Sequence, residues 1–236
     1  MQTPAAENFQ DESYRARVAA EKGIYEDCVK VHDLPQIFHY WSNKYVRPKL
    51  EAFGFSTPND MFKKYLLEQA QRQPQGALRF ASIGAGNCDL EITLASYLRA
   101  RGLSGFVIDC LELNPTMLER GRAAAAGEGV EEHIHLVEAD FNQWTPAHEY
   151  DAVLANQALH HVLNLEGLFG QIKSSLKPHG SFIISDIIGR NGHLRWPEAL
   201  DIVHEFWRKL PPSYRFNPIL NRFEDCLLYT SDAADE

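Results

Sequence analysis

Short apolar runs alternate with longer amphipathic segments between residues 76 and 210 of the chain. The apolar runs are typical of buried strands, and the segments between them repeat apolar residues at helical spacing. The pattern predicts strands over 78–84, 105–113, 133–139, 150–157 and 180–188, and helices over 89–102, 115–127, 164–180 and 195–210. Three glycines stand where we expect helices to stop: Gly102, Gly127 and Gly180. This alternation favours an α/β fold, a Rossmann-like, doubly wound and mostly parallel sheet.

Residues 1–75 show a different pattern, in which helical segments follow one another. The stretch from His32 to Pro48 is rich in aromatic residues and contains Arg47. It has two interpretations, a lid over a substrate or a helix that packs its aromatic side chains on the sheet. We therefore expect a helical N-terminal cap over 1–75, joined to the α/β domain through a turn-rich linker from Gln73 to Gly76.

Composition and charge exclude several classes of function. The formal net charge of −9 argues against nucleic acid as the main partner, because phosphate binding needs clustered Lys and Arg. The four cysteines are scattered, which fits neither a disulfide framework nor a zinc site, and we expect no metal. No apolar run reaches the ~20 residues of a membrane helix, and the N-terminus is polar and acidic, unlike a signal peptide. We expect a cytoplasmic protein without a membrane partner.

The stretch RFASIGAGNCDLEI, from Arg79 to Ile92, places two glycines between a predicted strand and a predicted helix. A dinucleotide fingerprint has a third glycine where Asp89 stands in this chain. A carboxylate at that helix start would lie close to an anionic pyrophosphate, which prefers bare N–H groups. The turn is therefore poorly made for NAD, and suits a positively charged ligand without phosphate.

Acids at the next two predicted strand ends extend this interpretation. Glu112 ends the second strand, 26 residues past Gly86, where it can accept hydrogen bonds from ribose hydroxyls. Asp140 ends the third strand, where it can accept from an adenine amine, or cap the next turn through Asn142. Phe141 beside it offers an apolar face to a ring. These positions indicate a ligand that contains a nucleoside.

Four segments in order carry a family resemblance: SIGAGNCDLEI, LELNPTMLERGR, EADFNQW and YDAVLANQALHHV. They resemble the motifs of class I S-adenosylmethionine-dependent methyltransferases of the small-molecule type, over about residues 76–190. Cys88 stands where the first motif usually has its last glycine. The resemblance implies an S-adenosylmethionine-binding Rossmann-like domain over 76–189, and a loop and helix over 190–225 that border the substrate pocket. It also implies methyl transfer to an oxygen or nitrogen of a small molecule.

The resemblance assigns the cofactor S-adenosyl-L-methionine to eight residues: Gly84, Ala85, Gly86, Glu112, Leu113, Asp140, Phe141 and Asn156. For Asp89 and Glu91 we expect first-turn helix acids that favour the helix dipole, with contact to the cofactor's tail as the alternative.

The pair His160 and His161 provides the main catalytic candidates. A histidine after the fourth strand can act as general base on a substrate hydroxyl or amine, since its pKa lies near working pH. The alternative is a structural role for one of the pair, by packing or hydrogen bonding. Asp186 is a lesser catalytic candidate, and Arg190 and Arg195 are candidates for reading a substrate carboxylate or phosphate.

The last eleven residues, Cys226 to Glu236, resemble a translated sequencing adapter of the transposase type. We expect the natural sequence to stop near Asp225 in this chain, and the natural protein to continue beyond it. In this fold two further strands usually close the sheet, so we expect the sheet to lack them.

Three other functions compete with the methyltransferase. One is an NAD(P)-dependent oxidoreductase, against which Asp89 argues. The second is a non-catalytic module that binds S-adenosylmethionine, which only a turnover measurement distinguishes. The third is an aminopropyltransferase-like relative that uses a decarboxylated cofactor.

Overall fold

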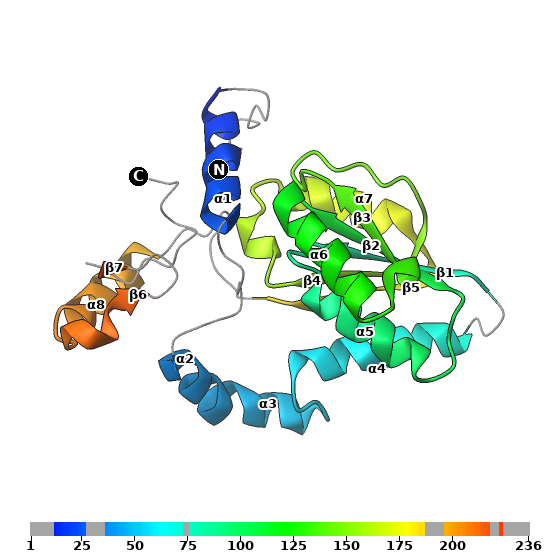
Figure 1. The fold of residues 1–236 in the computed structure, drawn as a ribbon. Coiled ribbons are helices and arrows are strands. Elements are labelled where there is room, and N and C mark those ends of the chain that lie inside the picture. The colour runs from blue at the N-terminus through cyan, green and yellow to red at the C-terminus, as the bar shows by residue number, and fades with distance from the viewer. Residues whose placement is uncertain (1–11, 27–35, 73–75, 187–195, 218–221, 224–236) are drawn as a thin grey trace. The chain divides into compact units, whose positions relative to one another are not determined.

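The structure is a computed structural model that describes residues 12–26, 36–72, 76–186, 196–217 and 222–223 (Figure 1). The chain divides into two compact units. The sheet unit comprises Lys30–Leu159 and Asn164–Asp186, and the second unit comprises Met1–Val29, His160–Leu163 and Ile187–Glu236. The predicted domain boundaries at 75, 189 and 225 stay predictions. The predicted adapter residues Cys226 to Glu236, and Arg190 and Arg195, lie outside the described residues.

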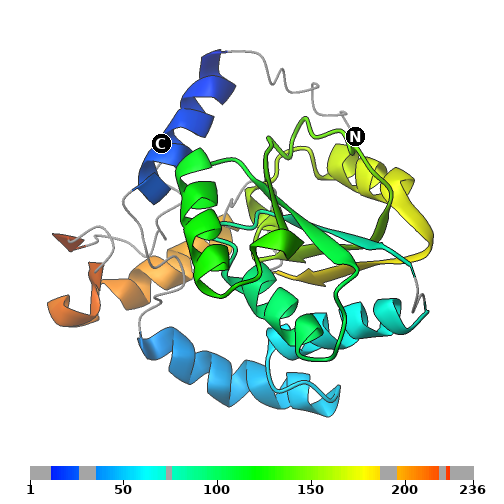
Figure 2. The same ribbon diagram turned by 45° about the vertical axis from the view of Figure 1, so that its right-hand side comes forward.

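The sheet unit contains five parallel strands in the order β3-β2-β1-β4-β5 (Figure 2). They are β1 Leu78–Ile83, β2 Phe106–Glu112, β3 Ile134–Glu138, β4 Tyr150–Asn156 and β5 Leu176–Ser185. The chain builds outward from β1 to β3, then returns to the other side of β1 with β4. The order therefore reverses beside β1, where sheets of this class bind ligands at the carboxyl ends of the strands. The predicted Rossmann-like, doubly wound sheet is confirmed.

Four helices of the sheet unit have clear sequence reasons for their bounds: α4 Pro58–Arg72, α5 Asp89–Arg99, α6 Pro115–Gly127 and α7 Leu165–Ser175. Thr57 and Asp60 cap α4 reciprocally, each side chain accepting the backbone N–H of the other residue. Asn114 caps α6 by accepting the N–H of Thr116, and Asn164 caps α7 by accepting that of Gly167. Each helix thus starts where its sequence supplies an N-cap, except α5, which follows the glycine turn.

One hydrophobic core joins α4 and α5 to one face of the sheet. Its largest fully buried side chains include Phe62, Leu66, Phe80, Leu94, Leu98, Ile108 and Leu154. In β4 every residue from Tyr150 to Ala155 is buried, as expected for a central strand of a covered parallel sheet. The edge strand β3 has no buried residue. The core therefore holds β1, β2 and β4 rigidly, and these strands carry most of the candidate site.

One predicted helix stop, that at Gly180, is corrected by the structure. The helix α7 ends at Ser175, and Gly180 lies inside β5, where the pairing with β4 shifts register between Tyr150 and Ala152. A Cβ on Gly180 would lie 2.9 Å from the Lys177 carbonyl oxygen, so the glycine allows close backbone approach at an irregular strand. The stop predicted at Gly127 is confirmed, because Gly127 is the last residue of α6, and Gly129, at φ +64, adopts the left-handed conformation just beyond it.

Before α4, the helices α2 Gln36–Trp41, η1 Ser42–Val46 and α3 Arg47–Ala52 follow one another directly. Large aromatic side chains are exposed along this segment: Tyr40, Trp41, Tyr45 and Phe53. Packing of these four on the sheet, one of the two interpretations above, is therefore wrong, and the lid interpretation stays a prediction.

The second unit contains α1 Glu12–Glu26, α8 Pro197–Trp207 and a short antiparallel pair, β6 Phe216–Asn217 with β7 Arg222–Phe223. This pair forms a two-stranded sheet of its own, separate from the five parallel strands. Short 3₁₀ turns occur at Glu131–His133, Leu159–His161 and Pro212–Tyr214. Within the described ranges, every helix falls short of the length and apolar character needed to cross a bilayer.

Candidate functional site

The turn between β1 and α5 uses three residues in the left-handed region. Gly84, Gly86 and Cys88 have φ values of +66°, +56° and +61°, with Ala85 and Asn87 between them. Glycine takes this conformation without steric cost, whereas Cys88 does not. Positive φ angles at every second residue fold the chain into a tight turn after β1. The turn predicted from the two glycines is therefore present.

The segments that follow β3 and β4 lie close to Gly84, at the end of β1. A Cβ at this position would lie 2.5 Å from the Cβ of Ala158, after β4, and 3.8 Å from the Phe141 ring, after β3. A Cβ on Gly86 would lie 3.3 Å from the Cε of Met117 in α6. Any larger residue at Gly84 would separate these segments, so the glycine is required by packing as well as by its φ angle.

Cys88 has room because α6 carries a glycine opposite it. A Cβ on Gly121 would lie 2.8 Å from the Cys88 Sγ and 3.2 Å from the Asn87 carbonyl oxygen. The buried thiol therefore occupies the space that a side chain at Gly121 would need. Sequence reasoning missed this pairing because the two residues lie on different elements, and only the packing of α6 on the turn relates them.

Glu112, at the end of β2, ties the turn to its own strand. Its Oε2 accepts the backbone N–H of Gly86 at 2.9 Å, and its Oε1 accepts that of Asn114 at 2.9 Å. The backbone N–H of Ala85 also donates to the Leu111 carbonyl at 2.9 Å. Glu112 therefore fixes the position of the turn relative to the end of β2. Leu113 follows directly and is half-buried.

Asp140 and Phe141 follow β3. The Asp140 Oδ1 accepts the backbone N–H of Asn142 at 3.0 Å, and its Oδ2 accepts the Gln143 side-chain amide at 2.8 Å. The capping contact with Asn142, considered from the sequence as an alternative, is therefore present. Both Asp140 and Phe141 are half-buried, and Phe141 lies next to Gly84.

The segment after β4 is held by an acid from the end of β5. Asp186 accepts the backbone N–H of Ala158 at 2.9 Å and that of Leu159 at 2.7 Å, both through Oδ2. Asn156, the last residue of β4, is half-buried and pairs with Ser185. In this structure Asp186 thus shapes the loop, a role that sequence reasoning missed because its partners are backbone groups 27 and 28 residues away.

His160 and His161 belong to the second unit, so the site in the sheet unit is described without them. Their rings lie next to each other, with centroids 4.2 Å apart, and both side chains are half-buried. The general-base role predicted for one of them stays a prediction.

Glu91 is the second buried acid beside the turn, in the first turn of α5. Its side chain is 2% exposed, and its Oε1 accepts the Ser82 hydroxyl at 2.5 Å. Burial raises the pKa of Glu91 to about 7, and the nearby carboxylates Asp89 and Glu112 add to the rise. Among the described residues its Oε2 has no hydrogen-bond partner. Burial without a partner for one carboxyl oxygen favours the protonated form of Glu91.

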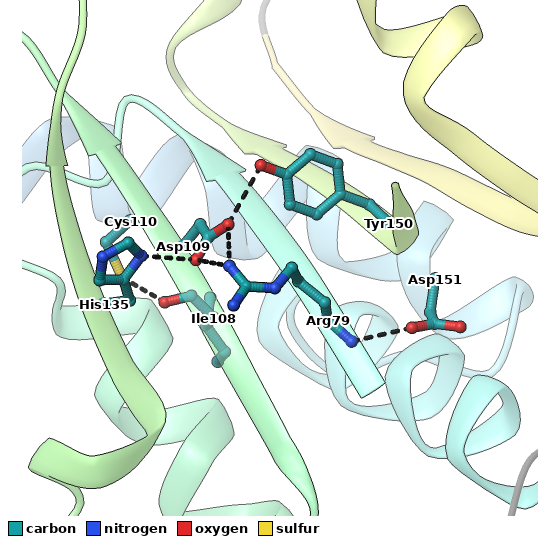
Figure 3. Close-up of polar contacts among 7 residues, drawn as sticks. All are labelled: Arg79, Ile108, Asp109, Cys110, His135, Tyr150 and Asp151. Carbon is teal, nitrogen blue, oxygen red and sulfur yellow. Dashed lines mark hydrogen bonds and ion pairs between the residues drawn. The ribbon is translucent and has the colours of Figure 1, made fainter. Parts of the chain in front are cut away.

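A separate polar cluster surrounds Asp109 in β2 (Figure 3). Arg79 donates from Nη1 to both carboxylate oxygens at 2.7 Å, His135 from Nδ1 at 2.8 Å, and Tyr150 from its hydroxyl at 3.1 Å. Burial and the Asp109 charge raise the pKa of Tyr150 above its usual range, so its phenol stays a donor. Asp109 is 2% exposed and has its partners on β1, β3 and β4. This cluster therefore links the strands to one another.

The turn and the acids around it can bind a cationic nucleoside ligand. The paired left-handed glycines leave space where a Cβ would otherwise stand, and backbone groups can approach a ligand there. Glu112 holds a carboxylate beside the turn, and Phe141 offers an apolar ring next to Gly84. Glu91, in the first turn of α5, favours a positive charge in the ligand over a phosphate group, whereas Glu112 occupies a position that nucleoside ligands of both kinds use. The residues present therefore fit S-adenosylmethionine better than NAD.

Comparison with known proteins agrees with this geometry. Residues 83–184 match a family described as a methyltransferase domain. The ubiquinone/menaquinone biosynthesis C-methyltransferase of Vibrio cholerae is 26% identical over 157 residues, which are 66% of this chain and 57% of that protein. The sterol 24-C-methyltransferase of Neurospora crassa is 36% identical over 73 residues, 30% of this chain and 19% of that protein. This chain thus spans little more than half the length of the Vibrio relative.

Among solved structures, an S-adenosylmethionine-dependent methyltransferase from Geobacter sulfurreducens, in complex with S-adenosyl-L-homocysteine, is similar. The two chains share 17% sequence identity with a TM-score of 0.41, over 64% of this chain and 55% of that chain.

Proposed function

We propose that this chain, whose residues 83–184 form an S-adenosylmethionine-dependent methyltransferase domain, methylates an oxygen or nitrogen of a small molecule. The observation that carries the proposal is the contact between the glycine turn and Glu112, whose carboxylate accepts the Gly86 N–H at 2.9 Å. This contact holds an acceptor at the end of β2 and a tight, backbone-lined turn at the end of β1. That is the arrangement a nucleoside with an amino-acid tail requires.

In this proposal, different residues of the chain bind different parts of the cofactor. Glu112 accepts from the ribose hydroxyls, with Leu113 beside it, while Asp140 accepts from the adenine amine. Phe141 and the other residues at the strand ends hold the rest: Gly84, Ala85 and Gly86 approach the amino-acid tail, and Asn156 offers backbone groups to its ammonium. The bound cofactor supplies a methyl group already activated by a positively charged sulfur.

The protein then has two tasks, to orient the acceptor and to take its proton. Orientation of two reactants and exclusion of water can supply much of the rate enhancement without a protein nucleophile. His160 or His161 takes the proton from the acceptor hydroxyl or amine in this proposal. The exposed aromatic segment from α2 to α3 covers the acceptor as a lid.

A carbon acceptor is the second candidate. Both relatives compared above are named as C-methyltransferases, one of the ubiquinone/menaquinone pathway and one of sterols. A C-methyltransferase also needs a base, so the histidine pair serves either reaction. A cytoplasmic location and a small molecule as the only substrate belong to the same proposal.

The test is isothermal titration of S-adenosylhomocysteine and, separately, NAD into the folded protein. We expect S-adenosylhomocysteine alone to bind, and Glu112→Ala to weaken its binding at least tenfold, since about 1.4 kcal/mol corresponds to tenfold. Glu119→Ala is the matched control, because Glu119 is an exposed acid on α6. Binding of NAD alone overturns the proposal. A turnover assay with labelled methyl groups and a panel of hydroxyl, amine and activated-carbon acceptors then separates the enzyme from a binding module.

A further inference from the structure

Glu91 lies below the glycine turn, at the junction of α5, β1 and β2. Its side chain is 2% exposed, and its Oε1 accepts a hydrogen bond from the Ser82 hydroxyl. Ser82 pairs with Cys110 in the parallel register of β1 and β2, so both face the side of the sheet that Glu91 covers. One carboxyl oxygen, Oε2, has no hydrogen-bond partner among the described residues.

The ionisable groups that act on Glu91 are acids and thiols. Asp89 on its own helix and Glu112 on β2 repel its charge, and Cys110 lies near enough to feel that charge in turn. Burial raises the pKa of the Cys110 thiol, with Cys88 of the turn as its neighbour, so that thiol stays neutral.

Three basic residues on the helices around Glu91 contact other groups. Lys63 on α4 lies over the Tyr97 ring, and Arg122 on α6 pairs with Glu119 at the exposed surface. At the opposite end of α5, Arg99 donates to the Gly129 carbonyl.

We propose that Glu91 is a positioning residue that makes the site distinguish a cationic cofactor from its uncharged-sulfur product. This inference rests on the function proposed above. S-adenosylmethionine carries one positive charge more than S-adenosylhomocysteine, on its sulfur. A cation bound beside the turn stabilises ionised Glu91, whereas the product, which lacks that charge, stabilises it less. Glu91 therefore favours the cofactor over the product and aids product release.

Proton linkage follows from this coupling. Burial raises the pKa of Glu91 to about 7, so the free protein holds Glu91 about half protonated near neutral pH. Binding the cationic cofactor drives Glu91 to its ionised form and releases a proton. The preference for S-adenosylmethionine is thus weak at low pH, where Glu91 is neutral, and grows as the pH rises through 7.

The experiment is calorimetric titration of S-adenosylmethionine and S-adenosylhomocysteine at about pH 6 and about pH 8. Ionised Glu91 rises from about one tenth to about nine tenths between these values, so the ratio of the two affinities should rise up to about tenfold. The cofactor's own ammonium also titrates, so Glu91→Gln, which keeps the bond to Ser82 but cannot ionise, is the reference. Glu119→Gln, at an exposed position, should behave as the wild type.

Repeating the titration near pH 7 in buffers of different ionisation enthalpy counts the protons released. We expect the wild type to release about half a proton more than Glu91→Gln when S-adenosylmethionine binds. Equal proton release and an equal pH profile in the two proteins overturn the inference, provided that both ligands bind. Failure of both ligands to bind any of the proteins contradicts the proposed function instead, so the two failures are distinguishable.

Discussion

Strand β2 carries two buried acids three residues apart, Asp109 and Glu112, and their surroundings differ. Asp109 is surrounded by donors from the chain itself, a guanidinium, an imidazole and a phenol (Figure 3). Glu112 accepts two backbone N–H groups at the end of the strand, and its neighbour Glu91 has a free carboxyl oxygen. The first acid has its cation in Arg79, while Glu91 has, among the residues that the structure describes, the Ser82 hydroxyl as a donor and the acids Asp89 and Glu112 nearby.

The difference separates a structural acid from acids that, in our proposal, serve a ligand. A buried charge is tolerated where the fold supplies a counter-charge and hydrogen bonds, as at Asp109. At the carboxyl end of the sheet, Glu91 lies near the carboxylates Asp89 and Glu112. Burial and these two charges raise the pKa of Glu91 and favour its protonated form. We propose that a cationic cofactor binds there and stabilises the ionised form of Glu91, at the place where such sheets bind ligands.

The largest effect is expected from removing the structural acid. Asp109→Ala leaves Arg79, which is 29% exposed, without its carboxylate and cuts links to three other strands of the sheet. Breaking a buried pair of this kind costs about 3–5 kcal/mol of the free energy of unfolding, which urea denaturation measures. Glu51→Ala breaks an exposed pair with Arg47 and should cost less than about 1 kcal/mol. Equal losses in the two variants would show that Asp109 is not the structural acid described here.

A second, smaller effect concerns the glycine turn. Gly84→Ala places a Cβ 2.5 Å from that of Ala158 and forces alanine to φ +66°. The left-handed backbone and the overpacking together should cost about 2–4 kcal/mol, and S-adenosylhomocysteine binding should be lost. Thermal unfolding and calorimetry check both results. Gly170→Ala, in a helix with open space around it, is the control and should stabilise the protein by about 1 kcal/mol. Unchanged binding in Gly84→Ala would place the ligand elsewhere.

Removing the charge of Glu91, unlike removing that of Asp109, should raise the stability of the protein. Because the folded-state pKa of Glu91 lies at about 7, above its ordinary value of 4.5, the folded protein holds its proton longer than the unfolded chain. Stability is then full below about pH 4.5 and falls until about pH 7, by up to about 3 kcal/mol. Glu91→Gln should escape this loss and become more stable than the wild type at pH 8. Denaturation of both proteins from pH 4 to pH 8 tests it, and parallel pH curves would refute a raised pKa.

The smallest effect should come from the contact between the turn and α6. Gly121→Ala brings a Cβ within 2.8 Å of the Cys88 Sγ and should destabilise the protein by about 1–3 kcal/mol. Cys88→Gly removes that thiol, so the double variant should recover about 1 kcal/mol of this loss. A double-mutant cycle on unfolding free energies measures the coupling, and strict additivity would mean that the two residues do not depend on each other.

Much of the fold was predictable from local pattern. The five predicted strands and four predicted helices of the α/β region all occur, most with bounds shifted by one to three residues. The turn at Gly84 and the acid at Glu112 follow from sequence, because glycine spacing and strand ends are local features. The predicted stop at Gly180 failed because its close approach to β4 depends on strand register, which no local pattern contains.

The contacts that sequence reasoning missed are long-range. Asp109 reads as one polar residue in an apolar strand, and its partners Arg79, His135 and Tyr150 come from three other strands. The sequence pattern presents Glu91 as an ordinary acid in the first turn of a helix. Its burial against Ser82 depends on how α5 packs on β1. Such roles become visible only when the sheet brings the residues together.

The central claim, that the acids at the carboxyl end of the sheet are made for a cationic cofactor, is tested most directly by the pKa of Glu91. Carbon-13 NMR of protein labelled at glutamate side-chain carboxyls reports it, with Glu91→Gln to assign the signal. We predict a pKa of about 7 in the free protein and a lower value in the complex with S-adenosylmethionine. A value near 4.5 in the free protein, or an unchanged value in the complex, would contradict the account.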